Sequence, residues 1–108
     1  MNTQYKKGVL ELCVLSLLQK HDRYGYEISE TLAGHIDIAD GTVYPILRKL
    51  KADGLLTTYL QEESGGPPRK YYTLTALGRE TYQAARAEYL HFARSVKQLL
   101  EDEELDEK

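Results

Sequence analysis

The chain has 108 residues, a formal net charge of −3 and one cysteine. This length fits one small domain, and a single cysteine excludes an intrachain disulfide, which favours a reducing cytoplasm. No apolar run approaches the ~20 residues that a membrane span needs, and the first residues lack the layout of a signal peptide. We therefore expect a cytoplasmic protein without a membrane partner.

The negative charge is unevenly distributed along the chain. Residues 101–108 hold six acids and one base, a charge of −5, whereas residues 41–79 hold six bases and three acids, a charge of +3. Acidic ends of this kind are usually solvated and disordered. The net charge therefore leaves room for a nucleic-acid-binding middle, and we expect residues 101–108 to form a disordered tail.

Two helices are expected in the first third of the chain. An apolar block at residues 9–18 covers nearly the whole circumference of a helix, which indicates burial on two sides and a second subunit as the supplier of one of them. Tyr24, Ile28 and Leu32 recur at i, i+4 and i+8, which predicts a short second helix ended by Gly34.

A third helix is expected over residues 42–52. Asp40 or Thr42 is the candidate cap, and Pro45 must lie in the first turn, where its missing N–H does least harm. Asp53 and Gly54 end the helix.

A β-hairpin and a long helix complete the chain. Residues 55–61 alternate as a strand does, residues 62–68 form a turn in which two prolines exclude regular pairing, and residues 69–74 form the return strand. Thr75 is the candidate cap of a last helix that runs to about Leu100.

Apolar residues on this last helix recur at alternating spacings of 3 and 4, the pattern of two helices that pack along their length. The set consists of Tyr82, Ala85, Tyr89, Phe92, Val96 and Leu99. We expect these residues, together with Leu12 of the first helix, to form a homodimer interface. The alternative is that the row covers the protein's own core.

The order of helix, helix, helix, hairpin and long helix predicts a mainly α protein with a β-hairpin. It describes a winged helix-turn-helix at residues 1–74, a C-terminal dimerisation helix at 75–100 and the acidic tail at 101–108. Winged helix-turn-helix modules insert the third helix into the major groove of double-stranded DNA and lay the hairpin on the backbone or in the minor groove.

The residue types agree with that function. Tyr44, Arg48 and Lys51 fall on one line of the third helix, where Arg suits the O6 and N7 atoms of guanine and Lys suits phosphate. Arg69 and Lys70 lie beside a Gly- and Pro-rich turn that is small enough to approach DNA. An ordinary solvated polar face is the alternative. The predicted DNA-binding set is Thr42, Tyr44, Pro45, Arg48, Lys49, Lys51, Arg69 and Lys70.

Three segments resemble the PadR family of bacterial transcriptional regulators. They are YGYEI at residues 24–28, GTVYPILRKLKADGLL at 41–56 and RKYYTLTALG at 69–78. The size resembles a short subfamily with a single C-terminal helix. The resemblance covers about residues 5–100 and implies a homodimeric, ligand-responsive repressor, with groove contacts at residues 42, 44, 45, 48 and 49 and wing contacts at 69 and 70.

The same resemblance implies an effector site. In a lactococcal multidrug-resistance regulator of this subfamily, planar drugs stack on a tryptophan of the C-terminal helix, in a pore between the subunits. This chain has no tryptophan, and the matching position is Tyr89, whose ring still stacks. With Gly8, Glu11 and Leu12 it forms the predicted site for a small aromatic or phenolic effector. The alternative is that Tyr89 only packs in the dimer core.

Other functions have weaker support in the sequence. His21, His35 and His91 lie on different predicted elements, so we expect no metal site and no cofactor. Neither a phosphate-binding loop nor a nucleophile elbow occurs, and we expect no enzyme. The second class that remains is a winged-helix protein-interaction module without specific DNA binding, against which the bases of the third helix and wing argue.

Overall fold

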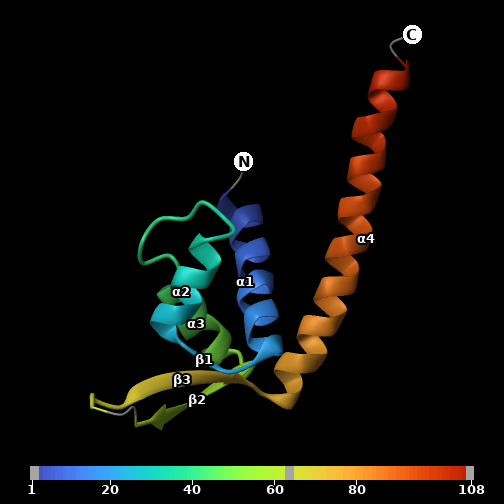
Figure 1. The fold of residues 1–108 in the computed structure, drawn as a ribbon. Helices are drawn as coiled ribbons and strands as arrows, with labels where there is room; N and C mark the ends of the chain where they lie inside the picture. Colours follow the sequence, from blue (N-terminus) through green and yellow to red (C-terminus); the bar gives the residue numbers. More distant parts are fainter. Residues whose placement is uncertain (1–2, 63–64, 107–108) are drawn as a thin grey trace.

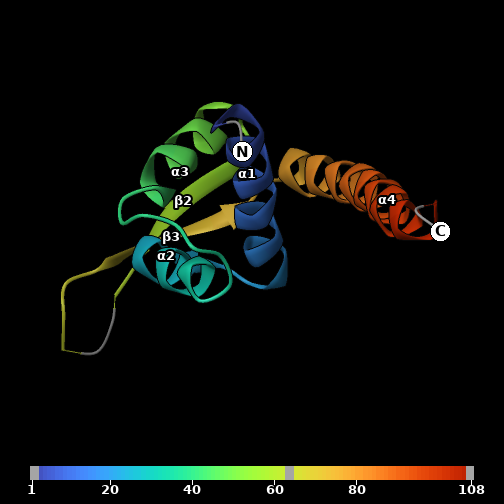
Figure 2. The same ribbon diagram turned by 90° about the horizontal axis from the view of Figure 1, so that it is seen from above.

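The structure, a computed structural model, describes residues 3–62 and 65–106. Its elements in chain order are α1 (Thr3–Lys20), β1 (Arg23–Tyr24), α2 (Gly25–Ala33), α3 (Val43–Ala52), β2 (Leu56–Gln61), β3 (Arg69–Leu74) and α4 (Ala76–Asp106). The elements from α1 to β3 pack into one body, which we call the head, and α4 projects from it as a rod (Figures 1 and 2). The molecule therefore measures 65 × 28 × 22 Å.

One apolar core holds the head together. It is built from Leu10, Val14, Leu15, Leu17, Leu18, Ile28, Leu32, Val43, Ile46, Leu47, Leu50, Leu56 and Leu74. Ile28 and Leu32 of the predicted α2 stripe belong to this list, as do the buried residues of α3, because apolar side chains three and four residues apart lie on one side of a helix. Tyr24, the first residue of the predicted α2 stripe, lies in β1 instead. The predicted fold, a mainly helical winged helix-turn-helix with a hairpin, is confirmed.

The sheet has three antiparallel strands in the order β1–β3–β2. Leu56 pairs with Leu74, and both are buried beneath the sheet. Tyr59 pairs with Tyr71, and Tyr71 also pairs with Tyr24 of β1. These three tyrosines lie on the face away from the core, since side chains alternate along a strand. The sequence does not predict β1, because two residues are too few to form a pattern.

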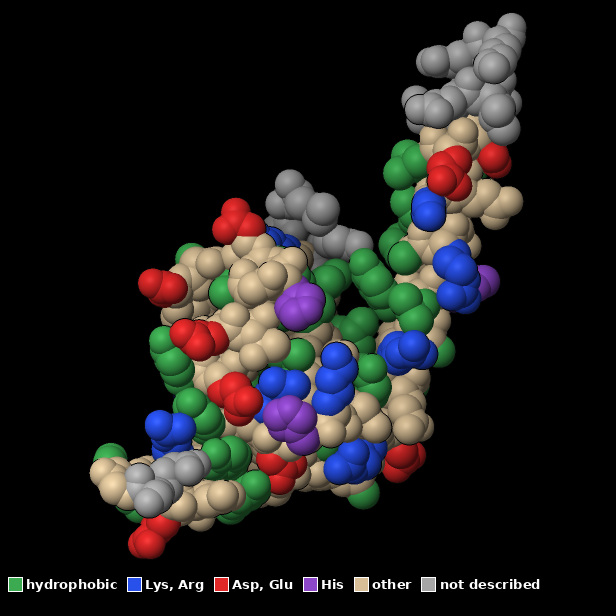
Figure 3. Space-filling model, in the orientation of Figure 1, with side chains coloured by type: hydrophobic (Ala, Val, Ile, Leu, Met, Phe, Trp, Pro, Cys, Tyr) green, Lys and Arg blue, Asp and Glu red, His purple; other side chains and the backbone are tan. Residues whose placement is uncertain are grey.

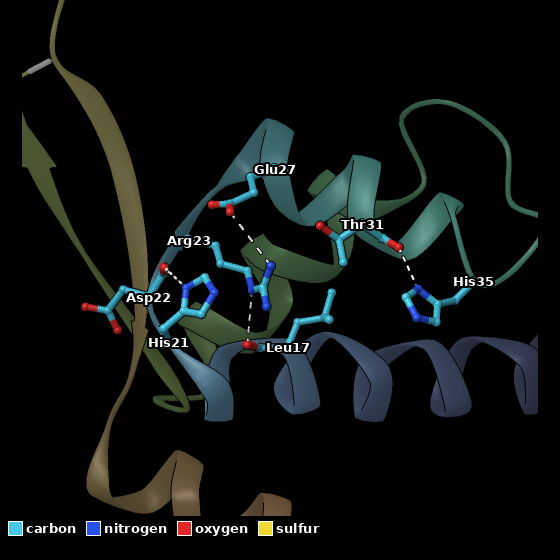
Figure 4. Close-up of polar contacts among 7 residues, drawn as sticks. All are labelled: Leu17, His21, Asp22, Arg23, Glu27, Thr31 and His35. Carbon is cyan, nitrogen blue, oxygen red and sulfur yellow. Dashed lines mark hydrogen bonds and ion pairs between the residues drawn. The ribbon is translucent and has the colours of Figure 1, made fainter. Parts of the chain in front are cut away.

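Arg23 of β1 is a charged residue buried in the head, with an exposure of 8%. Its Nε donates to the carbonyl oxygen of Leu17 at 3.2 Å, and its guanidinium lies 3.8 Å from the carboxylate of Glu27 (Figure 4). The side chain therefore satisfies a carbonyl in the last turn of α1, a group that has no intrahelical partner, and links that turn to α2. His21 and His35 bond only to nearby backbone oxygens of Asp22 and Thr31.

Two helix ends agree with their predicted signals. Gly54 has a φ of +79°, and Gly54 and Leu55 donate back to the carbonyls of Lys51 and Leu50, which is the Schellman arrangement. Thr75 caps α4, because its hydroxyl accepts from the N–H of Gly78 at 3.0 Å. At the start of α3 the prediction is wrong: Thr42 occupies the cap position but makes no capping bond through its side chain.

The long helix differs from its predicted end. α4 continues to Asp106, so residues 101–106 of the expected disordered tail are helical, while 107 and 108 lie outside the described residues. Glu and Leu favour helix, and this preference outweighs the expected effect of the acidic run. α4 begins in tight contact with the head, because a Cβ on Gly78 would collide with the carbonyl oxygen of Leu55.

Candidate nucleic-acid interface

The exposed side of α3 carries the predicted row of polar residues. Tyr44, Arg48 and Lys51 are all exposed, opposite the buried stripe of the same helix. In the described part of the chain no carboxylate pairs with Arg48, whereas Lys51 donates to the hydroxyl of Thr58 on β2 at 3.2 Å. Arg48 therefore keeps its donors available, and Lys51 leans toward the sheet.

Basic side chains from α3 and the hairpin meet at one pocket of about 420 Å³, which we call the basic pocket. Its lining residues are Tyr24, Gly25, Tyr26, Tyr44, Arg48, Arg69, Lys70 and Tyr72. Arg48 comes from α3, whereas Arg69 and Lys70 come from β3. The fold therefore brings together three of the predicted DNA-binding bases, although 21 or more positions separate Arg48 from the others in the sequence.

Aromatic rings form the walls of the basic pocket. Gly25 lets the ring of Tyr44 come close, since a Cβ would lie 2.9 Å from its Cε1 atom and the ring would have to shift. Burial raises the pKa of Tyr72, as does the neighbouring Tyr44, and the guanidinium of Arg48 partly opposes this shift. The hydrogen bond from Tyr26 to Glu30 raises the pKa of Tyr26. The hydroxyl proton of Tyr26 is thus engaged by Glu30.

Lys49 differs from its neighbour Arg48. Its Nζ lies 3.0 Å from the carboxylate of Asp53 and 3.4 Å from that of Glu11. The bond to Asp53 is the main cause that raises the pKa of Lys49, and Glu11 adds to it. Lys49 thus bridges α3 to α1 and lies outside the basic pocket, although it belongs to the predicted DNA-binding set.

Thr42, just before α3, and Pro45, in its first turn, lie away from the basic pocket. They line a second pocket, of about 330 Å³, with the first residues of α1 and the loop before α3. The fold therefore separates the predicted DNA-binding residues. Lys49 pairs with carboxylates and Lys51 contacts Thr58. The others line either the basic pocket or this second pocket.

Sequence reasoning missed the aromatic half of the basic pocket. Tyr24, Tyr26 and Tyr72 were not predicted as site residues, and neither was Gly25. The signal was present, since tyrosine is concentrated around β1 and β3, but only the pairing of β1 with β3 reveals that these segments lie against α3.

Part of the predicted dimer and effector sets, including Leu12, Ala85, Tyr89 and Phe92, lies between α1 and α4. A groove of about 680 Å³ lies there, lined by Gly8, Val9, Leu12, Thr81, Ala84, Ala85, Glu88, Tyr89 and Phe92. Figure 3 shows the hollow between the head and α4, with apolar side chains beside it. Glu11 does not line this groove. It directly precedes Leu12 on α1, so its side chain points to a different side of the helix, where its carboxylate pairs with Lys49. Of the four residues predicted for the effector, Gly8, Leu12 and Tyr89 line this groove and Glu11 does not.

The apolar row on α4 is partly buried where the helix begins and more exposed further along it. Tyr82 is partly buried against the protein's own core. Further along, Phe92 is 54% exposed, Leu99 71% and Leu100 62%. The alternative that the row covers the head therefore applies to its first residue, whereas the far half of α4 leaves an apolar surface uncovered in a single chain.

The described residues, 3–62 and 65–106, hold no group of three or more His, Cys, Asp or Glu side chains arranged to bind a metal ion. Within the same ranges, none of the helices has the length and apolar character to cross a membrane.

The fold and the basic pocket define a winged helix-turn-helix protein with a cationic cleft between its third helix and its wing. Comparison with known proteins identifies the family. Residues 14–84 match the transcriptional regulator PadR-like family, and the chain belongs to it.

Several relatives agree with this assignment. A transcriptional regulator of Mycobacterium tuberculosis is 29% identical, with 86% of this chain and 87% of that protein covered. Among solved structures, a PadR-like transcriptional regulator from Bacillus cereus is 34% identical with a TM-score of 0.82, over 91% of this chain and 97% of that one. A protein from Streptococcus mutans is 38% identical with a TM-score of 0.78, over 84% and 85%. The chain is therefore a DNA-binding transcriptional regulator of the PadR-like family.

Proposed function

We propose that this regulator is a cytoplasmic homodimeric repressor, which binds a pseudo-palindromic operator and releases it when a small aromatic or phenolic effector binds. The observation that carries the DNA-binding part is the convergence of Arg48, Arg69 and Lys70 on one pocket. Three cations from two separate elements, without a carboxylate among the lining residues, favour a phosphate backbone as the occupant.

The roles of these bases follow from their places. Arg48 lies on the exposed side of α3, the helix that such modules insert into the major groove, so we assign it to a guanine edge. Arg69 and Lys70 lie on the wing, and we assign them to phosphates. Two heads related by a dimer axis would then read half-sites about one helical turn, roughly 10 bp, apart.

The uncovered apolar surface of α4 supports the dimer. Exposed Phe92, Leu99 and Leu100 continue the row that begins at Tyr82, and apolar rows at this spacing pack against a second helix. We assign the partner surface to α1 and α4 of a second copy. The effector would occupy the groove of Gly8, Leu12 and Tyr89, where its binding changes the angle between α4 and the head and thus the separation of the two wings.

The decisive experiment is selection of genomic fragments by the purified protein, followed by sequencing and by titration of the selected duplex at several salt concentrations. Each phosphate contact contributes about −0.9 to the slope of log K against log salt, so two protomers with Arg69 and Lys70 on phosphates give a slope of about −3.6. A protein that selects no fragment, or whose binding does not depend on salt, would be the protein-interaction module instead.

The effector assignment has its own test. A panel of phenolic acids and planar aromatic compounds is screened for release of the selected duplex, and the response of any active compound is repeated with Tyr89→Ala. Loss of the response, with DNA affinity retained, supports Tyr89 as the stacking residue. An unchanged response excludes it.

A further inference from the structure

The outer face of the sheet carries a contact that the proposed function leaves unexplained. The Cζ atom of Arg69 lies 4.4 Å from the centroid of the Tyr24 ring. Tyr24 pairs with Tyr71 across β1 and β3, and Arg69 stands two residues before Tyr71 on β3. Arg69 is thus the diagonal neighbour of Tyr24 on the same face. The contact follows from the register of the two strands.

Tyr24 is itself held in a row of tyrosines that crosses all three strands. Its ring meets Tyr71 edge-on, with centroids 5.6 Å apart, and Tyr71 stacks on Tyr59 at 5.7 Å. The hydroxyl of Tyr59 donates to the carboxylate of Asp22 at 2.8 Å. The row therefore ends at the residue before β1, and the ring of Tyr24 contacts Tyr71 as well as Arg69.

Arg69, by contrast, is an exposed side chain near the tip of the wing. No carboxylate pairs with it among the residues that the structure describes. A long exposed arginine loses considerable rotamer freedom when it binds a phosphate, and a contact that restricts it beforehand lowers that cost. Tyr24 and Arg69 both line the basic pocket, so the contact holds the guanidinium at the pocket rather than out in solvent.

We propose that Tyr24 is a positioning residue for DNA binding, whose ring holds the guanidinium of Arg69 where a backbone phosphate of the duplex meets the basic pocket. The proposal rests on the proposed function, since it takes the wing to meet DNA. The ring carries the effect and the hydroxyl does not, because a cation–π contact uses the face of the ring. Guanidinium also remains free to bond through its edge while its plane rests on an aromatic face.

The first experiment tests the contact without DNA. In a ¹H–¹⁵N spectrum the Nε–H signal of Arg69 is assigned as the one missing from Arg69→Gln, and the ring current of Tyr24 is expected to shift its proton upfield. Tyr24→Phe keeps this shift and Tyr24→Leu removes it. A signal that does not move in Tyr24→Leu would overturn the proposal.

The second experiment measures affinity for the selected duplex. Tyr24→Phe is expected within about twofold of the wild type, and Tyr24→Leu about two- to fivefold weaker, which is the range of an exposed cation–π contact. In the Arg69→Gln background Tyr24→Leu adds no further loss, because the two residues act as a unit. Equal weakening in both backgrounds would mean that Tyr24 acts through the fold or through another contact, and the proposal fails.

Controls separate this proposal from the proposed function. Tyr59→Phe removes the bond to Asp22 but keeps the row of rings, and is expected within twofold of the wild type. If Tyr24→Leu does not fold, Arg69→Lys tests the contact from the other side, since lysine keeps the charge but not the flat guanidinium, and a two- to fivefold loss is expected. A wild type that binds no duplex overturns both proposals. A wild type matched by Arg69→Gln overturns this proposal and the assignment of Arg69 to a phosphate, while operator binding itself stands.

Discussion

The head and α4 differ in how they expose apolar side chains to solvent. In the head, apolar side chains of α1, α2, α3 and the sheet close on one core, and the fully buried side chains include Leu18, Ile28, Leu47 and Leu50. On α4, Phe92, Leu99 and Leu100 are mostly exposed. Figure 2 shows the reason, because the helix points away from the head after its first turns. The head buries its apolar core within the single chain, whereas α4 leaves large apolar side chains exposed, as the proposed dimer requires.

The largest expected effect is a loss of folding stability from a substitution in the core of the head. Leu47→Ala leaves a cavity in the core and is expected to lower the free energy of unfolding by about 2–5 kcal/mol. The matched variant Leu99→Ala, at a residue that is 71% exposed, is expected to leave the unfolding of the single chain nearly unchanged and to weaken self-association. Urea titration and sedimentation velocity over a range of concentrations measure the two effects. Equal destabilisation by both variants would contradict the comparison.

The junction between the two regions is tested by Gly78→Ala. The added Cβ meets the carbonyl oxygen of Leu55, so α4 must shift against the head, at a cost of about 1–3 kcal/mol for overpacking. Gly66→Ala is the matched control, since nothing lies within 4 Å of its Cβ position. Thermal unfolding followed by circular dichroism measures both. A Gly78→Ala protein as stable as Gly66→Ala would show that the close approach does not fix the junction.

Within the head, Arg48 and Lys49 are expected to behave differently. Arg48→Ala should weaken binding to the selected duplex by about 1–3 kcal/mol and relax the preference at one base pair, because Arg48 lines the basic pocket. Lys49→Ala should change DNA affinity far less, because its ammonium is engaged by Asp53 and Glu11. Fluorescence anisotropy with the operator and with single-base variants distinguishes these outcomes. Similar losses for both variants would return Lys49 to the DNA-binding set.

The smallest expected effect concerns Cys13, on the α1 surface beside α4. Burial raises the pKa of its thiol, so less thiolate is present near pH 8 in the folded chain than in the unfolded chain. Since the thiolate is the nucleophile, alkylation by iodoacetamide should be slower in buffer than in urea. Equal rates would place Cys13 in open solvent.

The sequence predicted more of the head than of the site. The α2 positions Ile28 and Leu32, the turn at Gly54 and the Thr75 cap depend on neighbours within a few residues, and these predictions are confirmed. Tyr24, the first member of the predicted α2 stripe, lies in β1 instead. The contact between Lys49 and Glu11 joins residues 38 positions apart, and no local pattern predicts it. The family resemblance placed Glu11 with Gly8 and Leu12, whereas in the structure its carboxylate faces Lys49 of α3.

The sequence by itself determined which segments are helices and strands, where most of them end, and to which family the chain is similar, because spacing, capping and turn residues act locally. Only the tertiary structure decided which charges meet. It paired a two-residue strand with β3, placed Tyr24 beneath Arg69, gathered Arg48, Arg69 and Lys70 around one pocket and engaged Lys49 elsewhere. The direction of a side chain in space depends on how its element packs, and packing is settled by the whole core rather than by any one segment.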